Sequence, residues 1–213
     1  MKEKIIIGAG RHAAETYYLL EDLGLHEDII AFATDDASPG QEFMGVKVWT
    51  ISEILKTYGE RQDKPSVIIA VGATEPNKRL ALVFRKASFP FFNAISPNIA
   101  LMRQQSIGEG VTIAQGVVLT CNVSVGNHVI INIGCTISHD CVLGDHVNLS
   151  PGCHLAGNVH IEEDVFVGTG VVFIPKVRVG RGSVIAAGAC VTKDVPPNVM
   201  VAGVPATIKK QLR

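Results

Sequence analysis

The sequence contains a pair of neighbouring residues suited to proton transfer, the histidine and aspartate at positions 139 and 140. Imidazole titrates near neutral pH, so His139 can take the proton that an amine or hydroxyl loses as it attacks a carbonyl carbon. A carboxylate beside the ring, here Asp140, fixes the tautomer and raises the basicity of the histidine. We interpret His139 as a candidate general base and Asp140 as its partner. The alternative is that both are exposed residues without a chemical role.

A second group of residues could hold phosphate and ribose. Gly8-x-Gly10-x-x-Ala13 follows a short apolar run and opens a helical pattern, so its backbone N–H groups could bind a pyrophosphate. The pair Asp35-Asp36 could accept hydrogen bonds from ribose or base hydroxyls. The glycines could also form only a tight turn. Because a full dinucleotide fold needs two mononucleotide halves, we expect a small nucleotide-recognition domain and not a nicotinamide site.

The first part of the chain alternates strand and helix patterns, as a Rossmann-like parallel α/β sheet does. Ligands of such sheets bind beyond the carboxyl ends of the strands, which here are Gly8–Gly10, Asp35-Asp36 and Gly72. The predicted strands are Lys4–Ile7, Ile29–Ala33, Val46–Trp49 and Ser66–Val71, and the predicted helices cover about His12–Leu23, Ile51–Tyr58 and Asn77–Lys86.

The second part of the chain repeats every six residues. From Ile107 to Val191, fifteen positions at steps of six are all large and apolar. Three residues after each, fourteen of the fifteen are Gly, Asn, Asp or His, the types that best tolerate positive φ, and Lys176 is the exception. A short strand followed by such a corner builds a three-sided parallel β-helix with an 18-residue coil. Fifteen hexads give five coils.

Composition separates the two parts and excludes several classes of function. Of the first 92 residues 24 are charged, against 15 of the remaining 121, so we expect two domains, 1–92 and 93–213. The formal net charge of −1 gives no reason to expect nucleic acid as a partner. No apolar run approaches the ~18 residues of a membrane span, so membrane insertion is not expected. Five irregularly spaced cysteines and no visible signal peptide favour the cytoplasm.

The 18-residue coil predicts which residues stack. Gly157 follows His139 by 18, so its backbone N–H is placed to stabilise the oxyanion formed at an attacked carbonyl. His128 and His146 should likewise stack in adjacent coils. Such a pair could begin a zinc site, but we identify no third ligand in their column and expect no metal.

Together these features resemble one family. The start at Gly8–Gly10, the pair Asp35-Asp36, the hexads, Ile137–Cys141 and Val201–Ala206 are similar to the NeuD-like sugar acyltransferases. The resemblance covers the whole chain and implies a left-handed parallel β-helix after the Rossmann-like domain. It also implies a homotrimer and acetyl-CoA as co-substrate. The family includes the N-acetyltransferases of nucleotide-linked 4-amino-4,6-dideoxy sugars of the bacillosamine and perosamine pathways.

The resemblance assigns roles residue by residue. His139 becomes the base and Gly157 the oxyanion-binding residue, in a direct transfer without a covalent acyl-enzyme. Residues that match the family's acetyl-CoA contacts are Asn148, where the family has histidine, Thr169 and Ala187. Residues assigned to the nucleotide-linked amino sugar are Gly10, Arg11, His12, Asp35, Asp36 and Gly72. Close relatives have Ser-Gly where this chain has Gly10-Arg11, so the arginine could contact phosphate. Asn77–Arg79 could add phosphate contacts or be a solvated helix start.

Our principal prediction is an acetyl-CoA-dependent N-acetyltransferase that acts on the 4-amino group of a nucleotide-linked amino-dideoxy sugar. Three alternatives stay open at this point. One is an O-acetyltransferase of a sugar such as sialic acid. Another is an NAD(P)-binding oxidoreductase, which rests on Gly8-x-Gly10 alone. The last is a non-catalytic or metal-binding β-helix, which rests on the stacked histidines.

Overall fold

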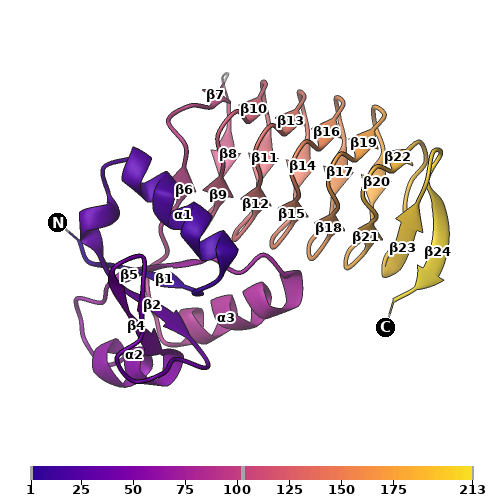
Figure 1. The fold of residues 1–213 in the computed structure, drawn as a ribbon. Helices are drawn as coiled ribbons and strands as arrows, with labels where there is room; N and C mark the ends of the chain where they lie inside the picture. Colours follow the sequence, from indigo (N-terminus) through magenta and orange to yellow (C-terminus); the bar gives the residue numbers. More distant parts are fainter. Residues whose placement is uncertain (1, 102–103, 213) are drawn as a thin grey trace. The chain divides into compact units, whose positions relative to one another are not determined.

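The computed structural model describes residues 2–101 and 104–212, and the chain divides into two compact units, 1–94 and 95–213 (Figure 1). The first unit contains β1 (Lys4–Ile7), α1 (Arg11–Asp22), the 3-10 helix η1 (His26–Asp28), β2 (Ile29–Thr34), β3 (Glu42–Phe43), β4 (Val46–Thr50), α2 (Ile51–Tyr58), β5 (Ser66–Ile69) and α3 (Thr74–Lys86). None of the helices in the described ranges is long and apolar enough to cross a membrane.

The first unit is a doubly wound sheet with strand order β3-β4-β2-β1-β5. β1 pairs in parallel with both β2 and β5, so the chain changes direction across the sheet at β1. Alternate residues of β1 face opposite sides. Ile5 and Ile7 pack in the same apolar layer as Ile54 of α2 and Phe84 of α3, whereas Ile6 packs in the layer that contains Leu20 of α1. The predicted Rossmann-like sheet, with helices on both faces, is therefore present.

The second unit is a prism of two-residue strands. They are β6 (Ala94–Ile95), β7 (Ala100–Leu101), β8 (Ser106–Ile107), β9 (Thr112–Ile113), β10 (Val118–Leu119), β11 (Ser124–Val125), β12 (Ile130–Ile131), β13 (Thr136–Ile137), β14 (Val142–Leu143), β15 (Asn148–Leu149), β16 (His154–Leu155), β17 (His160–Ile161), β18 (Phe166–Val167), β19 (Val172–Phe173), β20 (Arg178–Val179), β21 (Val184–Ile185) and β22 (Cys190–Val191), followed by β23 (Val199–Ala202) and β24 (Thr207–Gln211).

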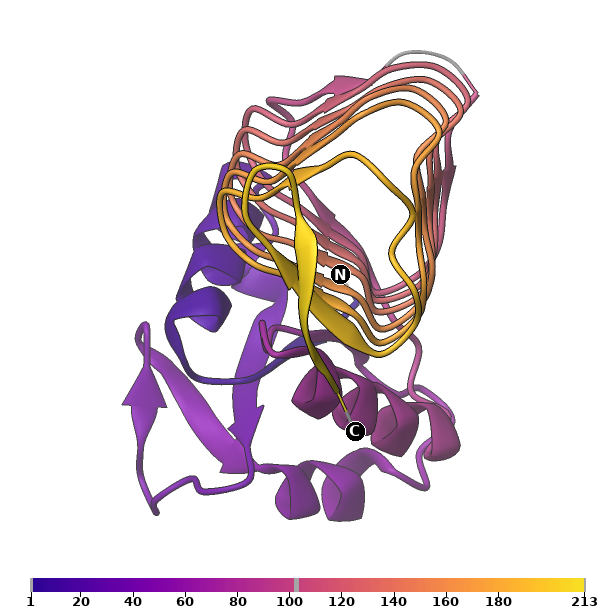
Figure 2. The same ribbon diagram turned by 90° about the vertical axis from the view of Figure 1, so that its right-hand side faces the viewer.

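Three parallel sheets form the sides of this prism, which Figure 2 shows along its axis. Side one, running β6-β9-β12-β15-β18-β21, is extended by β23 and β24. Side two runs β7-β10-β13-β16-β19-β22, and side three runs β8-β11-β14-β17-β20. Neighbouring strands on one side are one coil apart in sequence, as in the pair Ile137 and Leu155. The hexad residues from Ile113 to Val191 are buried inside the prism, which confirms the predicted left-handed parallel β-helix.

The corners confirm the backbone conformation predicted from the repeat. Fourteen of the fifteen predicted corner residues have positive φ, including Lys176 at 69°. The last predicted corner, Asp194, is not among the described residues with positive φ. The next hexad position is Pro197, and proline lacks the N–H that a further strand needs. The regular hexad repeat therefore ends here: Val195 makes only an isolated bridge to Val179, and β23 then adds a last parallel strand to side one.

Some elements differ from the sequence-based expectation. The repeat begins earlier, because Ile95 and Leu101 occupy hexad positions ahead of Ile107. The antiparallel β3–β4 and β23–β24 pairs were not predicted. Helix α3 begins at Thr74, not near residue 77, because Pro76 is tolerated in a first helical turn.

Candidate active site and nucleotide cavity

The predicted base and its carboxylate meet at a corner of the prism, directly after β13. Nδ1 of His139 lies 2.7 Å from Oδ2 of Asp140, so this bond fixes the ring and directs Nε2 away from the carboxylate. The other carboxylate oxygen accepts a hydrogen bond of 2.6 Å from Nδ2 of Asn122. The bonds from Asn122 and then His139 hold the pKa of Asp140 below its ordinary value. The carboxylate is therefore charged at neutral pH.

Gly157 lies against the ring of His139, as the 18-residue coil predicts. A Cβ atom on Gly157 would lie 2.5 Å from Nε2 and 2.6 Å from Cε1 of that ring. Any side chain at position 157 would displace the imidazole. Within the described part of the chain, the Gly157 N–H donates no backbone hydrogen bond. A proton acceptor and an unused amide donor therefore lie side by side, which is the arrangement that attack on a carbonyl requires.

The three buried cysteines offer no comparable nucleophile. The thiols of Cys135, Cys141 and Cys153 are buried, and their Sγ atoms contact the backbone oxygens of Ser150, Ala156 and Gly168 at 3.2–3.3 Å. Burial raises the pKa of the Cys141 thiol. The Cys153 thiol donates to Cys135, and this bond together with burial raises the pKa of Cys153, while it lowers the pKa of the fully buried Cys135. Buried thiols without a neighbouring base are poor nucleophiles.

The first unit carries a cavity of about 530 Å³ at the carboxyl ends of its strands. Gly8 makes the close approach possible there. Its φ is 127°, and a Cβ atom would lie 2.7 Å from the carbonyl oxygen of Ala70, at the end of β5. The space above Gly10 is open, so that glycine has no steric partner in the chain itself and leaves its backbone accessible to a ligand. The lining residues are Gly8, Ala9, Gly10, Arg11, His12, Thr34, Asp36, Gln41, Ala70, Val71 and Gly72.

Of the six residues predicted to bind the nucleotide-linked sugar, five line this cavity and one, Asp35, does not. Gly10, Arg11, His12, Asp36 and Gly72 line the cavity. Nε2 of His12 is buried and has no hydrogen-bond partner among the described residues, although Nδ1 lies 3.3 Å from a carboxylate oxygen on the next turn.

Asp35 does not line the cavity. Its Oδ2 lies 2.6 Å from Nη2 of Arg79, so this carboxylate binds helix α3. Asn77, a suggested phosphate contact, is also structural. It is buried, and its side-chain amide donates to the carbonyl oxygens of Ile69 and Val71. Arg79 and Asn77 therefore fasten α3 beside the strand ends.

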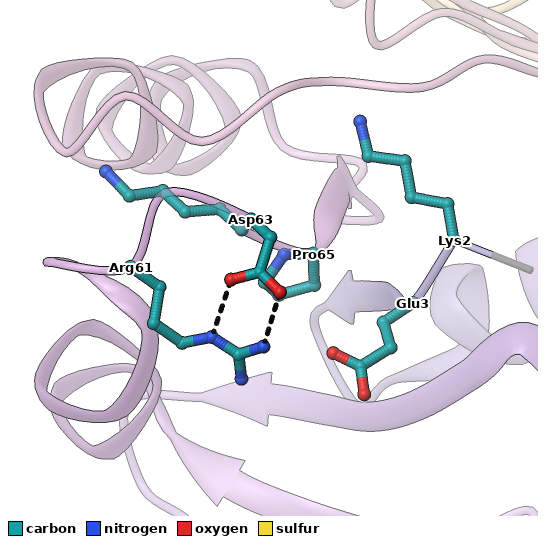
Figure 3. A pocket seen from close by; sticks show the side chains of 6 residues that line it. Lys2, Glu3, Arg61, Asp63 and Pro65 are labelled. Atoms are coloured by element: carbon teal, nitrogen blue, oxygen red, sulfur yellow. Dashed lines mark hydrogen bonds and ion pairs between the residues drawn. The ribbon is translucent and has the colours of Figure 1, made fainter.

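A cavity of about 520 Å³ lies at the opposite, amino-terminal ends of β1 and β5 (Figure 3). Two of the five charged side chains in its wall pair with each other. Arg61 donates to both carboxylate oxygens of Asp63, at 3.2 and 3.1 Å. This pairing raises the pKa of Arg61 and lowers that of Asp63. We assign it no function.

The predicted acetyl-CoA contacts lie on other parts of the prism than His139. Thr169 and Ala187 are exposed residues of neighbouring coils, at the edge where side one turns into side two. His139 and Gly157 lie at the next edge, where side two turns into side three. Asn148 is in β15 on side one and is buried. A single prism thus does not bring the predicted acyl-donor contacts to the base.

The stacked histidines correct one sequence-based statement. The rings of His128 and His146 are parallel to within 11°, with centroids 5.1 Å apart, as predicted. The statement that their column holds no third ligand was wrong, because Asp164 occupies the same position one coil after His146. The described residues nevertheless contain no group of three or more His, Cys, Asp or Glu placed to hold a metal ion.

Sequence reasoning missed three residues of these sites. Asn122 lies one coil before Asp140 in the sequence, so the coil period could have identified it. Thr34 and Gln41 line the cavity at the strand ends of the first unit. Thr34 directly precedes the acidic pair, but no motif marks Gln41, which a loop brings to the cavity.

A solved structure resembles this protein over nearly the whole chain. A variant of the perosamine N-acetyltransferase of Caulobacter crescentus, solved with CoA and GDP-perosamine, is 31% identical to it. The two superpose with a TM-score of 0.89 over 99% of this chain and 98% of that one. The chain belongs to the NeuD-like sugar acyltransferases.

Other matches to this NeuD-like acyltransferase agree. The acetyltransferase domain of PglB from Neisseria gonorrhoeae, in complex with acetyl coenzyme A, is 28% identical, with a TM-score of 0.89 over 98% of this chain and 99% of that one. The family "Bacterial transferase hexapeptide (six repeats)" matches residues 158–193. Galactoside O-acetyltransferase of Lactococcus lactis is 50% identical over 54 residues. The match spans about a quarter of the length of such curated relatives, 26% in this case.

These matches confirm the predicted family, the fold class and the assignment to the acyltransferases. They also confirm the predicted co-substrate, since PglB holds acetyl coenzyme A and the perosamine enzyme holds CoA.

Proposed function

We propose that this NeuD-like acyltransferase moves an acetyl group from acetyl-CoA to the 4-amino group of a nucleotide-linked amino-dideoxy sugar. The observation that carries the proposal is the likeness, over 99% of the chain, to a perosamine N-acetyltransferase that binds CoA and GDP-perosamine. The cavity at the strand ends supports it, because it combines glycine backbone, Arg11 and Asp36. We place the reaction in the cytoplasm, in the biosynthesis of a glycan.

In the proposed reaction His139 Nε2 accepts a proton from the sugar amine as its nitrogen attacks the acetyl carbonyl carbon. Asp140, bonded to Nδ1, stabilises the imidazolium that forms. The Gly157 N–H donates to the oxyanion of the tetrahedral intermediate. When the intermediate collapses, the C–S bond breaks and CoA leaves as thiolate, which takes up the proton. The transfer is direct and needs no acyl-enzyme.

The acceptor is tested by measuring thiol release from acetyl-CoA with a panel of sugars. The panel holds UDP-, GDP- and dTDP-linked 4-amino-4,6-dideoxy sugars, their 4-hydroxy counterparts, sialic acid and a galactoside. We expect turnover with at least one nucleotide-linked amine and little or none with its 4-hydroxy counterpart, because a neutral amine is a stronger nucleophile toward a thioester than a hydroxyl group. Turnover only with free sialic acid or the galactoside would favour the O-acetyltransferase alternative and contradict the proposal.

A homotrimer is part of the proposal because one chain separates the acyl-donor contacts from the base. A neighbouring prism could bring its Thr169 and Ala187 edge beside the His139 edge of the first. Apolar side chains around these edges are left exposed: Ile133 by 54%, Val172 by 41% and Ile174 by 40%. A neighbouring copy of the same prism would cover them.

Light scattering under assay conditions tests this assembly. We expect a mass of about three times the 22.7 kDa of one chain. A fully active monomer would contradict both the trimer and the shared acyl-donor site.

Replacement of His139 by alanine tests the base. We expect kcat to fall by roughly 10²–10⁴, the usual contribution of a positioned general base, with little change in the affinity for either substrate. The exposed ring leaves no cavity when it is removed, so the unfolding temperature should not change. Asp140→Asn keeps a residue that tolerates the positive φ at this corner and should cost less. Near-normal turnover of His139→Ala between about pH 6 and 9 would rule out the base assignment.

A further inference from the structure

The dipeptide Cys121-Asn122 lies one coil before the pair His139 and Asp140, which we call the dyad. Each residue of the dipeptide forms one hydrogen bond with Asp140. The side-chain Nδ2 of Asn122 donates to Oδ1 of Asp140 at 2.6 Å. The carbonyl oxygen of the preceding residue, Cys121, accepts from the backbone N–H of Asp140 at 3.1 Å. On the other side, the backbone N–H of Asn158 donates to the carbonyl oxygen of His139 at 2.9 Å. The backbone of the dyad is thus fixed from both neighbouring coils, but its carboxylate is bound from one.

This bond determines which oxygen of Asp140 faces His139. Side-chain exposures of 44% for Asp140 and 56% for His139 allow water to compete for the carboxylate. With Oδ1 held by Asn122, Oδ2 is directed to Nδ1 of the ring at 2.7 Å. Without the amide, the carboxyl group can rotate about its terminal torsion, which is broad in aspartate. The ring would then lose its fixed orientation.

A similar asparagine–aspartate bond lies at another edge of the prism, where side three turns into side one. Asn127 donates to both carboxylate oxygens of Asp145, again one coil on, at 3.2 Å each. Both oxygens of that carboxylate are therefore used within the pair. In Asp140, by contrast, Oδ1 accepts from Asn122 and Oδ2 contacts His139. The Asn122–Asp140 pair therefore differs from the Asn127–Asp145 pair in leaving one carboxylate oxygen for the histidine.

We propose that Asn122 is a positioning residue for acetyl transfer, acting through Asp140 on His139. The inference rests on the proposed function, because it needs His139 to be the base. A positioning residue acts on kcat and leaves the binding of either substrate unchanged.

The test is Asn122→Gly in the full-length enzyme, with acetyl-CoA and the acceptor found in the panel. Glycine suits the φ of 57° at this corner and removes the side chain together with its amide. We expect kcat to fall about 5- to 20-fold, at the lower end of the range for outer-shell partners of functional histidines, with both KM values unchanged. Asn127→Ala removes the two side-chain bonds to Asp145 and the acceptor of the Glu109 N–H, but keeps the backbone bond of residue 127 to Asp145. It is the control for the loss of an asparagine–aspartate pair away from His139, with kcat expected within a factor of about two.

A double-mutant cycle separates positioning from stability. Asp140→Gly keeps the corner conformation and removes the group through which Asn122 acts. In that background Asn122→Gly should have no further effect on kcat. An equal fall in both backgrounds, or a fall matched by Asn127→Ala, would overturn the positioning role. Should Asn122→Gly not assemble, Asn122→Asp keeps the shape, removes the donor and is expected to lose at least as much activity.

The His139→Ala variant shows whether a negative result concerns Asn122 alone or the proposed base as well. If His139→Ala is inactive and Asn122→Gly has wild-type kcat, the positioning role is wrong and the proposed base is unaffected. If His139→Ala keeps normal turnover, the proposed mechanism fails and the role of Asn122 fails with it.

Discussion

The parallel hydrogen-bond ladder between residues of successive coils is the interaction on which the second unit depends. It sets a spacing of roughly 4.8 Å between neighbouring coils and fixes which residues stack. The N–H of Asn158 donates to His139 and that of Lys176 to Gly157, at 2.9 and 3.0 Å. These bonds bring together the candidate base His139 and the amide donor of Gly157, which lie a full coil apart in the sequence. One inserted residue between them would move Gly157 out of the column.

In the first unit, the strand order of the sheet determines which loops lie together. Its strand order places β1 between β2 and β5, so three strand ends converge where the chain reverses its direction across the sheet. Gly8 lets the loop after β1 approach Ala70 closely, and the cavity opens beyond it. In the proposed function the strand ends bind the nucleotide, while the prism carries the candidate base His139.

Periodic features were predictable from the sequence, and side-chain pairing was not. The hexad pattern predicts the corners, the stacking of His128 on His146 and the position of Gly157, since each follows from a fixed period. Asp35 and Asp36 are adjacent aspartates that the sequence alone does not distinguish. Only Asp36 lines the cavity, because Arg79 of α3, far away in the sequence, binds Asp35. No local pattern encodes that ion pair. The β23–β24 hairpin was likewise missed, because the repeat ends before it.

The contact between His139 and Gly157 is the centre of this account, and Gly157→Ala tests it most directly. The added methyl group would lie 2.5 Å from Nε2 and must displace the ring, whereas the backbone there has no positive φ that alanine would strain. We predict a fall in kcat of about 10²-fold, the effect of a misplacement of about 1 Å in a catalytic group, with an unchanged mass in light scattering and an unchanged unfolding temperature. Wild-type kcat in a folded Gly157→Ala enzyme would contradict the claim that acetyl transfer takes place at this corner.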